Sequence, residues 1–140
     1  MSQSDVAALF TLSNPQGLYD PSSNGYSHVA QVMPQARLLF IAGQGGEDAQ
    51  GCLSPVFAEQ ARQAIANVRT ALRSGGAGLE QVFKVTLLIV DHDAMKLRSW
   101  VQEAERAWGA AVMPVCTLIP VPRLALDGMQ IEIEVTAATT

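Results

Sequence analysis

The chain has 140 residues, of which 49% are hydrophobic and 16% are charged, and its formal net charge is -4. This length suits one compact unit, so we expect a single domain over residues 1–140. The negative charge and the nine scattered basic residues argue against nucleic-acid binding, which needs a dense positive surface. The high apolar fraction predicts that part of the hydrophobic surface covers a subunit interface.

Cys52 and Cys116 are far apart in sequence and lie in no metal-ligand spacing, and only His28 and His92 add soft ligands. We therefore expect no metal site. No leader pattern opens the chain, and no apolar run approaches the roughly 18 residues of a membrane span. The expectation is a cytoplasmic protein with reduced thiols and no membrane contact.

The first third of the chain alternates turn-forming segments with short strands. Residues 1–13 carry weak signals, in which residues 6–12 form either a strand or a frayed turn. Residues 26–33 alternate in polarity, residues 34–37 resemble a turn, and residues 38–42 form an apolar run that ends in the glycine-rich segment 43–46. This pattern predicts an antiparallel hairpin of 26–33 with 38–42.

The remainder predicts two helices and three strands. Ser54 and Pro55 are typical of a helix start, and Gly75 and Gly76 of its end. Residues 82–90 form a β-branched apolar run, which predicts a strand buried on both faces. Asp93 is a suitable cap for a second helix that ends before Gly109. Strands are expected at 115–121 and at 129–136, where Met129, Ile131, Ile133 and Val135 alternate with polar residues.

This element order predicts an α+β fold. Two strand–helix–strand crossovers give a mixed sheet with both helices on one face. The opposite face then stays uncovered within one chain. If that face is apolar, other subunits must cover it, so we expect a homo-oligomer.

Three features suggest chemistry without deciding it. The glycine-rich segment 43–46 lacks the lysine of a phosphate-binding loop and predicts a place where backbone passes close to a ligand or a neighbouring chain. Glu132 and Glu134 share one strand face, which is either solvated or supplies a general acid–base carboxylate. Cys116 lies within an apolar strand, where a buried structural cysteine is the more common outcome.

The segments taken together resemble the RidA/YjgF family, also called endoribonuclease L-PSP. The resemblance covers residues 14–137 in the family's order and spacing. It is carried by Asn24-Gly25-Tyr26-Ser27-His28, Leu39-Phe40-Ile41-Ala42-Gly43-Gln44, Glu59-Gln60 with Ala64 and Asn67-Val68, Val82-Phe83-Lys84-Val85-Thr86, Pro114 with Thr117-Leu118, Val121 and Leu124, and Ile131-Glu132-Ile133-Glu134.

The resemblance implies a chorismate-mutase-like fold and a homotrimer that binds small molecules in clefts between subunits. It also implies hydrolysis of reactive enamines or imines to a keto compound and ammonia, with no metal or organic cofactor. Family positions identify one catalytic residue and a set of substrate-binding residues. The catalytic residue is Glu132, which positions water, and the binding set is Tyr26, Gly43, Gln44, Cys116 and Thr117.

The chain departs from the family pattern in its expected pocket. Cys116 stands where the imine-hydrolysing branch has the arginine that binds the substrate carboxylate; Ala42 and Ser99 replace a serine and an asparagine. Two main hypotheses therefore stay open. One is an imine or enamine deaminase, and the other is a non-catalytic trimer that binds a metabolite or a protein, in a holdase or regulatory role. Ribonuclease activity is a distant third, which the acidic composition opposes.

Overall fold

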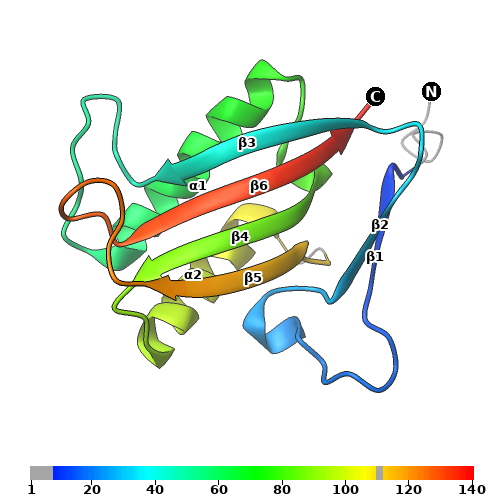
Figure 1. The fold of residues 1–140 in the computed structure, drawn as a ribbon, viewed down its shortest axis with the longest axis horizontal. Coiled ribbons are helices and arrows are strands. Elements are labelled where there is room, and N and C mark those ends of the chain that lie inside the picture. The colour runs from blue at the N-terminus through cyan, green and yellow to red at the C-terminus, as the bar shows by residue number, and fades with distance from the viewer. Residues whose placement is uncertain (1–7, 110–111) are drawn as a thin grey trace.

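A computed structural model of the chain describes residues 8–109 and 112–140. Figure 1 shows strands in front of two helices. The elements follow one another as β1 (Phe10–Ser13), a 3-10 helix η2 (Ser22–Asn24), β2 (Val29–Val32), β3 (Arg37–Gly45), α1 (Phe57–Ser74), a 3-10 helix η3 (Leu79–Gln81), β4 (Val82–Val90), α2 (Ala94–Trp108), β5 (Val115–Val121) and β6 (Ile131–Thr139).

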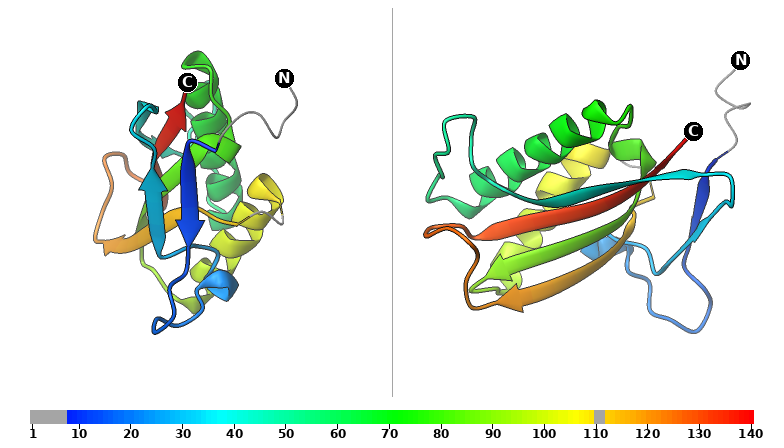
Figure 2. Two further views of the ribbon diagram at one scale, coloured as in Figure 1. Left: turned by 90° about the vertical axis from the view of Figure 1, so that its right-hand side faces the viewer. Right: turned by 45° about the horizontal axis from the view of Figure 1, so that its top comes forward.

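The main sheet is mixed and has four strands in the order β3-β6-β4-β5. β6 pairs antiparallel with both β3 and β4, whereas β4 and β5 run parallel, as the two crossovers predict. Both helices cover the same face of this sheet (Figures 1 and 2). The predicted α+β class, with two helices on one face of a mixed sheet, is confirmed.

The predicted hairpin of residues 26–33 with 38–42 is wrong. β2 pairs antiparallel with β1 in a separate two-stranded ribbon, in which Phe10 faces Val32 and Ser13 faces Val29. β3 pairs with β6 instead. In this position Leu39 and Ile41 pack against the helix-covered core, which a ribbon strand could not offer them. The ribbon stands apart from the main sheet in Figure 2.

α1 begins two residues later than predicted. The hydroxyl of Ser54 accepts a hydrogen bond from the Val56 amide at 3.1 Å, so it closes a turn before the helix and does not cap it. The helix then starts at Phe57 and ends at Ser74, with Gly76 in the left-handed conformation beyond it (φ 78°). Its buried stripe includes Ala61, Ala64, Ile65, Val68 and Leu72.

α2 follows its predicted signals. The Asp93 carboxylate accepts a hydrogen bond from the Lys96 amide at 2.8 Å, which caps the first turn. Gly109 (φ 76°) follows its last residue, Trp108.

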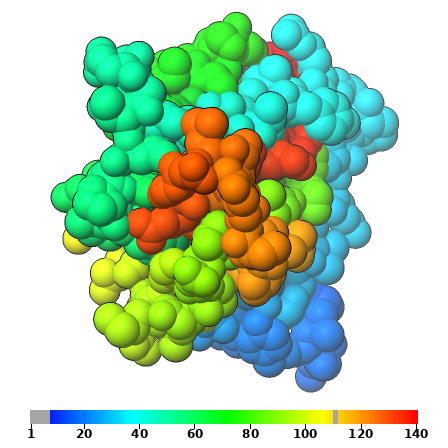
Figure 3. Space-filling model, turned by 60° about the vertical axis from the view of Figure 1, so that its left-hand side comes forward, coloured from blue at the N-terminus to red at the C-terminus, as the bar shows by residue number. Residues whose placement is uncertain are grey.

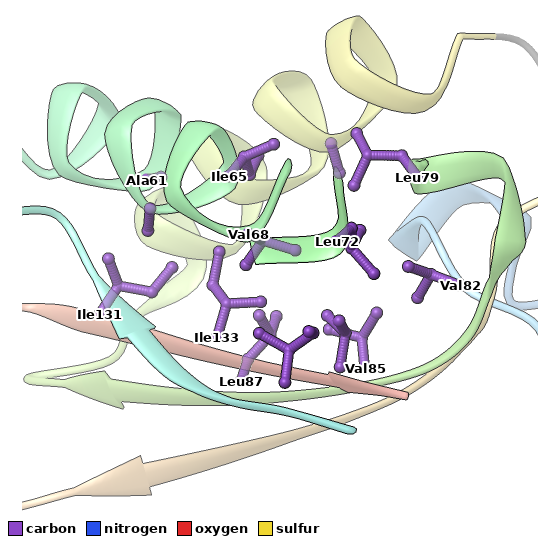
Figure 4. Packing of buried hydrophobic residues seen from close by; sticks show 14 of the residues in the cluster. Ala61, Ile65, Val68, Leu72, Leu79, Val82, Val85, Leu87, Ile131 and Ile133 are labelled. Carbon is purple, nitrogen blue, oxygen red and sulfur yellow. The ribbon is translucent and has the colours of Figure 1, made fainter. Parts of the chain in front are cut away.

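The core lies between the helices and one face of the sheet (Figure 4). Val85, Leu87 and Ile89 of β4 and the alternating Ile131 and Ile133 of β6 point into it. The prediction that residues 82–90 are buried on both faces is wrong for one copy of the chain. Lys84 is exposed, and the side chains that alternate with the core residues are only half-buried, because no helix covers the second face.

Candidate functional site

The residues predicted to form the site are divided between the two faces of the sheet. In β4 and β5, Cys116 is paired with Val85, whose side chain is buried under the helices. In β4 and β6, Glu132 is paired with Leu88, which lies on the uncovered face. Because side chains of paired residues share a face, Cys116 and Glu132 point to opposite sides.

Cys116 lines a cavity of about 390 Å³ on the helix side of the sheet, at the edge formed by β5. Tyr26, Cys116 and Thr117, three of the predicted binding residues, all lie along it. The complete lining is Asn24, Tyr26, Leu87, His92, Leu97, Trp100, Cys116, Thr117 and Leu118. None of these side chains carries a permanent charge, so the cavity favours neutral and apolar groups.

Tyr26 is held at the cavity by its neighbours in the chain. Ser27 is buried, and its amide and hydroxyl donate to the carbonyls of Pro114 and Met113 at 3.1 and 2.5 Å. These bonds fix the segment beside the start of β5. The Tyr26 hydroxyl shares a hydrogen bond with that of Tyr19, which raises the pKa of Tyr26 to about 12. The phenol therefore stays protonated at neutral pH.

His28 supports this arrangement from outside the cavity. Its ring lies edge-on to both tyrosines, at centroid distances of 5.3 Å to Tyr19 and 5.5 Å to Tyr26. Its Nε2 hydrogen-bonds the Tyr19 carbonyl at 2.8 Å. His28 thus orients the tyrosine pair.

Cys116 is both a structural residue and a residue of the cavity wall, the two roles considered for it from the sequence. It packs against the hydrophobic core and also lines the cavity. Burial raises the pKa of its thiol to about 12. The side chain is consequently a neutral thiol and not a thiolate nucleophile.

The other predicted site residues lie near the end of β3 and beside it on β6; they are Gly43, Gln44 and Glu132. The register of β3 with β6 shifts here, between Ile41 and Gln44. A Cβ atom on Gly43 would lie 2.0 Å from Oε1 of Glu132, so only glycine leaves room for this carboxylate as it is placed. The Gln44 side chain donates to the Ala42 carbonyl at 3.0 Å. Gly43 and Glu132 are therefore direct neighbours.

The glycine-rich segment passes close to its own chain, which the sequence did not predict. A Cβ on Gly46 would lie 2.7 Å from the backbone oxygen of Gln60 in α1. Gln60 is fully buried, and its side chain donates to the carbonyls of Ser54 and Gly128 at 2.7 and 2.8 Å. It also accepts from the Gln130 amide at 2.9 Å. Gln60 thus ties together the loops before α1 and before β6, which lie side by side in Figure 3.

Sequence reasoning missed several cavity residues. Trp100 is almost completely buried, and it lies one turn before Ala104 on the helix stripe, so helical spacing was the available signal. His92 follows the left-handed residue Asp91 (φ 50°) between β4 and α2, and no sequence pattern marks it. Its Nδ1 is buried without a hydrogen-bond partner among the described residues.

Within residues 8–109 and 112–140, no cluster of three or more His, Cys, Asp or Glu side chains is placed to hold a metal ion. Over the same residues, neither helix has the length and hydrophobicity needed to cross a membrane.

Comparison with solved structures finds this fold repeatedly. The Rid family protein YyfB from Yersinia pestis, described as of unknown function, is 29% identical and superposes with a TM-score of 0.87, covering 94% of this chain and 99% of its own. Rv2704 from Mycobacterium tuberculosis, of the YjgF/YER057c/UK114 family, is 26% identical with a TM-score of 0.62 over 93% and 99% of the two chains.

A third structure, E. coli TdcF with bound serine, is 23% identical with a TM-score of 0.65 and covers 92% of this chain and 94% of its own, a likeness of fold. No curated protein matches the sequence. The sequence profile of the family described as endoribonuclease L-PSP matches residues 19–139. With this match, and with the fold and the neighbouring Gly43 and Glu132 in place, the chain belongs to the endoribonuclease L-PSP (YjgF/Rid) family.

Proposed function

We propose that the protein is a homotrimer that binds small imines or enamines between subunits and hydrolyses them to a carbonyl compound and ammonia. One observation carries this proposal. Tyr26 and Cys116 line a cavity on the helix-covered side of the sheet, whereas Gly43 and Glu132 lie on the open face. A single copy cannot bring these groups to one ligand, but the edge of one copy can meet the open face of another.

The open face of the sheet supports association. It carries Leu38, Phe40 and Ile119, and Phe40 is 73% exposed in the single chain. Burying apolar surface stabilises association by roughly 25 cal/mol per Å² before the entropic cost of assembly. A second copy whose β5 edge covers these side chains would bring its Cys116 cavity toward the Glu132 of this face.

The completed site would need little catalytic apparatus. A protonated imine carbon is already electrophilic, so the main requirement is a well-placed water molecule. The Glu132 carboxylate would accept a proton as the water oxygen attacks that carbon. The protonated Glu132 would return this proton to the nitrogen, the carbon–nitrogen bond would break to release ammonia, and the hydroxyl proton would pass back to the Glu132 carboxylate as the carbonyl forms. The protonated Tyr26 hydroxyl would orient the bound molecule.

The cavity lining supports a neutral substrate. Leu87, Leu97, Trp100 and Leu118 give it apolar walls, and Cys116 is an uncharged thiol. The serine bound by TdcF carries a carboxylate, and no cationic side chain lines the cavity described here to pair with one. Imines with apolar or aromatic side chains therefore fit this chain better than acidic ones.

Imines generated in situ test this function: a flavin amine oxidase makes neutral imines from benzylamine and alkylamines, and an amino-acid oxidase makes 2-imino acids, which all carry a carboxylate. We expect ammonia release to accelerate for the neutral imines and much less for the 2-imino acids, and the acceleration to be lost in Glu132→Ala. Glu134→Ala is the matched control, because Glu134 is an exposed carboxylate on the same strand face. Acceleration that survives Glu132→Ala would refute the catalytic assignment.

The second candidate is a non-catalytic trimer that binds a metabolite or a protein. The neutral Cys116 in the cavity favours it, because no cationic side chain among those that line the cavity can bind a substrate carboxylate. Absence of turnover with all imines, together with trimer mass in light scattering, would support this candidate. A monomer mass at micromolar concentration would overturn both.

A further inference from the structure

A second concave surface lies between the helices, away from the predicted site. It is a groove of about 210 Å³ lined by Arg62, Ile65, Arg69, Glu103, Arg106 and Ala107. The residues from α1 recur at three- and four-residue spacing, and so do those from α2, so each helix contributes one stripe. Three of the six lining residues are arginines.

A buried carboxylate orders two of these arginines. Glu103 is only 5% exposed. One of its oxygens accepts from Arg62 Nη2 at 2.9 Å and from Arg106 Nη1 at 3.1 Å, and the other accepts from Arg62 Nε at 3.1 Å. The side chains of Arg62 and Arg106 nevertheless remain 59% and 67% exposed. Glu103 therefore holds both guanidinium groups in place while leaving donors free toward the groove.

Arg69 completes the groove from the next turns of α1. Its Nη2 donates to the Ala107 carbonyl at 3.2 Å, near the last residue of α2. This bond satisfies one of the free carbonyls at the helix end and positions the third guanidinium. The lining side chains, three arginines and one carboxylate, sum to a net charge of +2.

Although the protein as a whole is acidic, its basic residues are concentrated on the two helices that form this groove. α1 and α2 carry six of the nine basic residues and three of the thirteen acidic ones. The helices therefore sum to +3, and the rest of the chain to -7, within a total of -4. The positive potential of this acidic protein is concentrated on its helical layer, and the groove lies within that layer.

We propose that the groove between α1 and α2 binds a phosphate-type dianion. Guanidinium forks match the oxygens of phosphate, and several ordered forks suit a tetrahedral group with three free oxygens. A carboxylate offers two oxygens and one charge, which leaves part of the groove unpaired. The groove is open at the protein surface, so it accepts either free phosphate or the phosphate of a small phosphomonoester.

Isothermal titration calorimetry on the intact protein tests this site. The probes are inorganic phosphate, phenyl phosphate, dimethyl phosphate and acetate, in a phosphate-free buffer of low ionic strength at pH 8. We expect saturable binding of the two dianions and at least about tenfold weaker binding of the two monoanions. Tighter binding of phenyl phosphate identifies a monoester as the ligand, and tighter binding of inorganic phosphate identifies the free ion.

Arg69→Gln is the decisive variant, because it removes one charge without touching Glu103. We expect its dissociation constant for the preferred dianion to rise about tenfold or more. Arg98→Gln is the matched control, since Arg98 is an exposed arginine of α2 outside the groove, and its affinity should stay near wild type. Thermal unfolding of each variant checks that the fold is intact.

Two results would overturn the proposal. One is the absence of saturable heat with both dianions. The other is an equal loss of affinity in Arg98→Gln and Arg69→Gln, which indicates diffuse attraction to a positive surface and no defined site.

Discussion

The side chain of Glu132 in β6 fills the space that a side chain on Gly43 in β3 would need. A Cβ atom at residue 43 would lie 2.0 Å from Oε1 and 2.8 Å from Cγ of the glutamate. Gly43→Ala therefore requires the carboxylate to move. We expect it to lower the free energy of unfolding by about 1–3 kcal/mol, the usual cost of overpacking, and to impair any activity that depends on Glu132. Urea denaturation of the wild type and the variant measures the first effect.

The double variant identifies the cause. If the clash with Glu132 is responsible, Gly43→Ala should cost much less in a Glu132→Ala background. Equal costs in both backgrounds would show that residue 43 requires glycine for another reason.

A second prediction concerns the two free thiols. Cys52 is exposed, whereas burial raises the pKa of Cys116 to about 12. At pH 8 roughly one Cys116 side chain in ten thousand is then a thiolate. We expect iodoacetamide to alkylate Cys52 in the native protein and to spare Cys116, as peptide mass spectrometry would reveal. Both should react in denaturant, and rapid native labelling of Cys116 would contradict its buried, neutral state.

A third prediction concerns the buried amide of Gln60. Gln60→Leu keeps similar volume but leaves the Ser54 and Gly128 carbonyls and the Gln130 amide without their partner. These hydrogen bonds are only partly buried, so each lost partner costs about 1 kcal/mol, and a total loss of about 3 kcal/mol is expected in chemical denaturation. Gln63→Leu on the same helix is the control, because Gln63 is only half-buried. Comparable losses in the two variants would argue against the loop-tying role.

A fourth prediction is the pH dependence of Glu103. Its hydrogen bonds to Arg62 lower the pKa of its carboxyl below the ordinary value of 4.5. A carboxyl with a lower pKa in the folded state stabilises the fold fully above pH 4.5, and the contribution disappears as the pH falls through the folded pKa. Glu103→Gln should therefore cost about 1–2 kcal/mol at pH 7 and progressively less below pH 4.5. Urea denaturation over this range measures the difference, and a constant difference would exclude the ion pairs as its source.

A fifth prediction adds a charge to the cavity. Cys116→Arg should raise turnover of imines that carry a carboxylate by about tenfold to hundredfold, through a charge-assisted pair with the substrate. Cys116→Met, which adds bulk without charge, is the control. A trimeric Cys116→Arg protein with no gain would show that the missing arginine does not limit this activity.

Local sequence patterns predicted most of the helices and strands, because residues close together in the chain determine where each one begins and ends. The alternation of Ile131, Ile133 and Val135, the Asp93 cap and Gly75 after the last residue of α1 all operate within a few residues. The partner of β2 could not be predicted this way, since it depends on a competition between β1 and β3 for the same backbone groups.

The sequence likewise predicted only part of the candidate site. Family spacing predicted Tyr26, Cys116 and Glu132, but the division of Cys116 and Glu132 between two faces depends on the register of β4 with its neighbours. His92 and Trp100 reach the cavity through the way α2 packs on the sheet, a relationship that spacing along the chain does not contain.

The hydrogen bonds of Ser27 have a consequence for local opening of the molecule. They attach the segment that bears Tyr26 to the residues just before β5. The same hydrogen bonds therefore hold both one wall of the cavity and one edge of the sheet in place. A fluctuation that releases Ser27 would open the cavity and expose the edge of β5 together. Ligands that brace Tyr26 should accordingly slow hydrogen exchange of the Ser27 amide, a signal that reports occupancy of the cavity even in the absence of turnover.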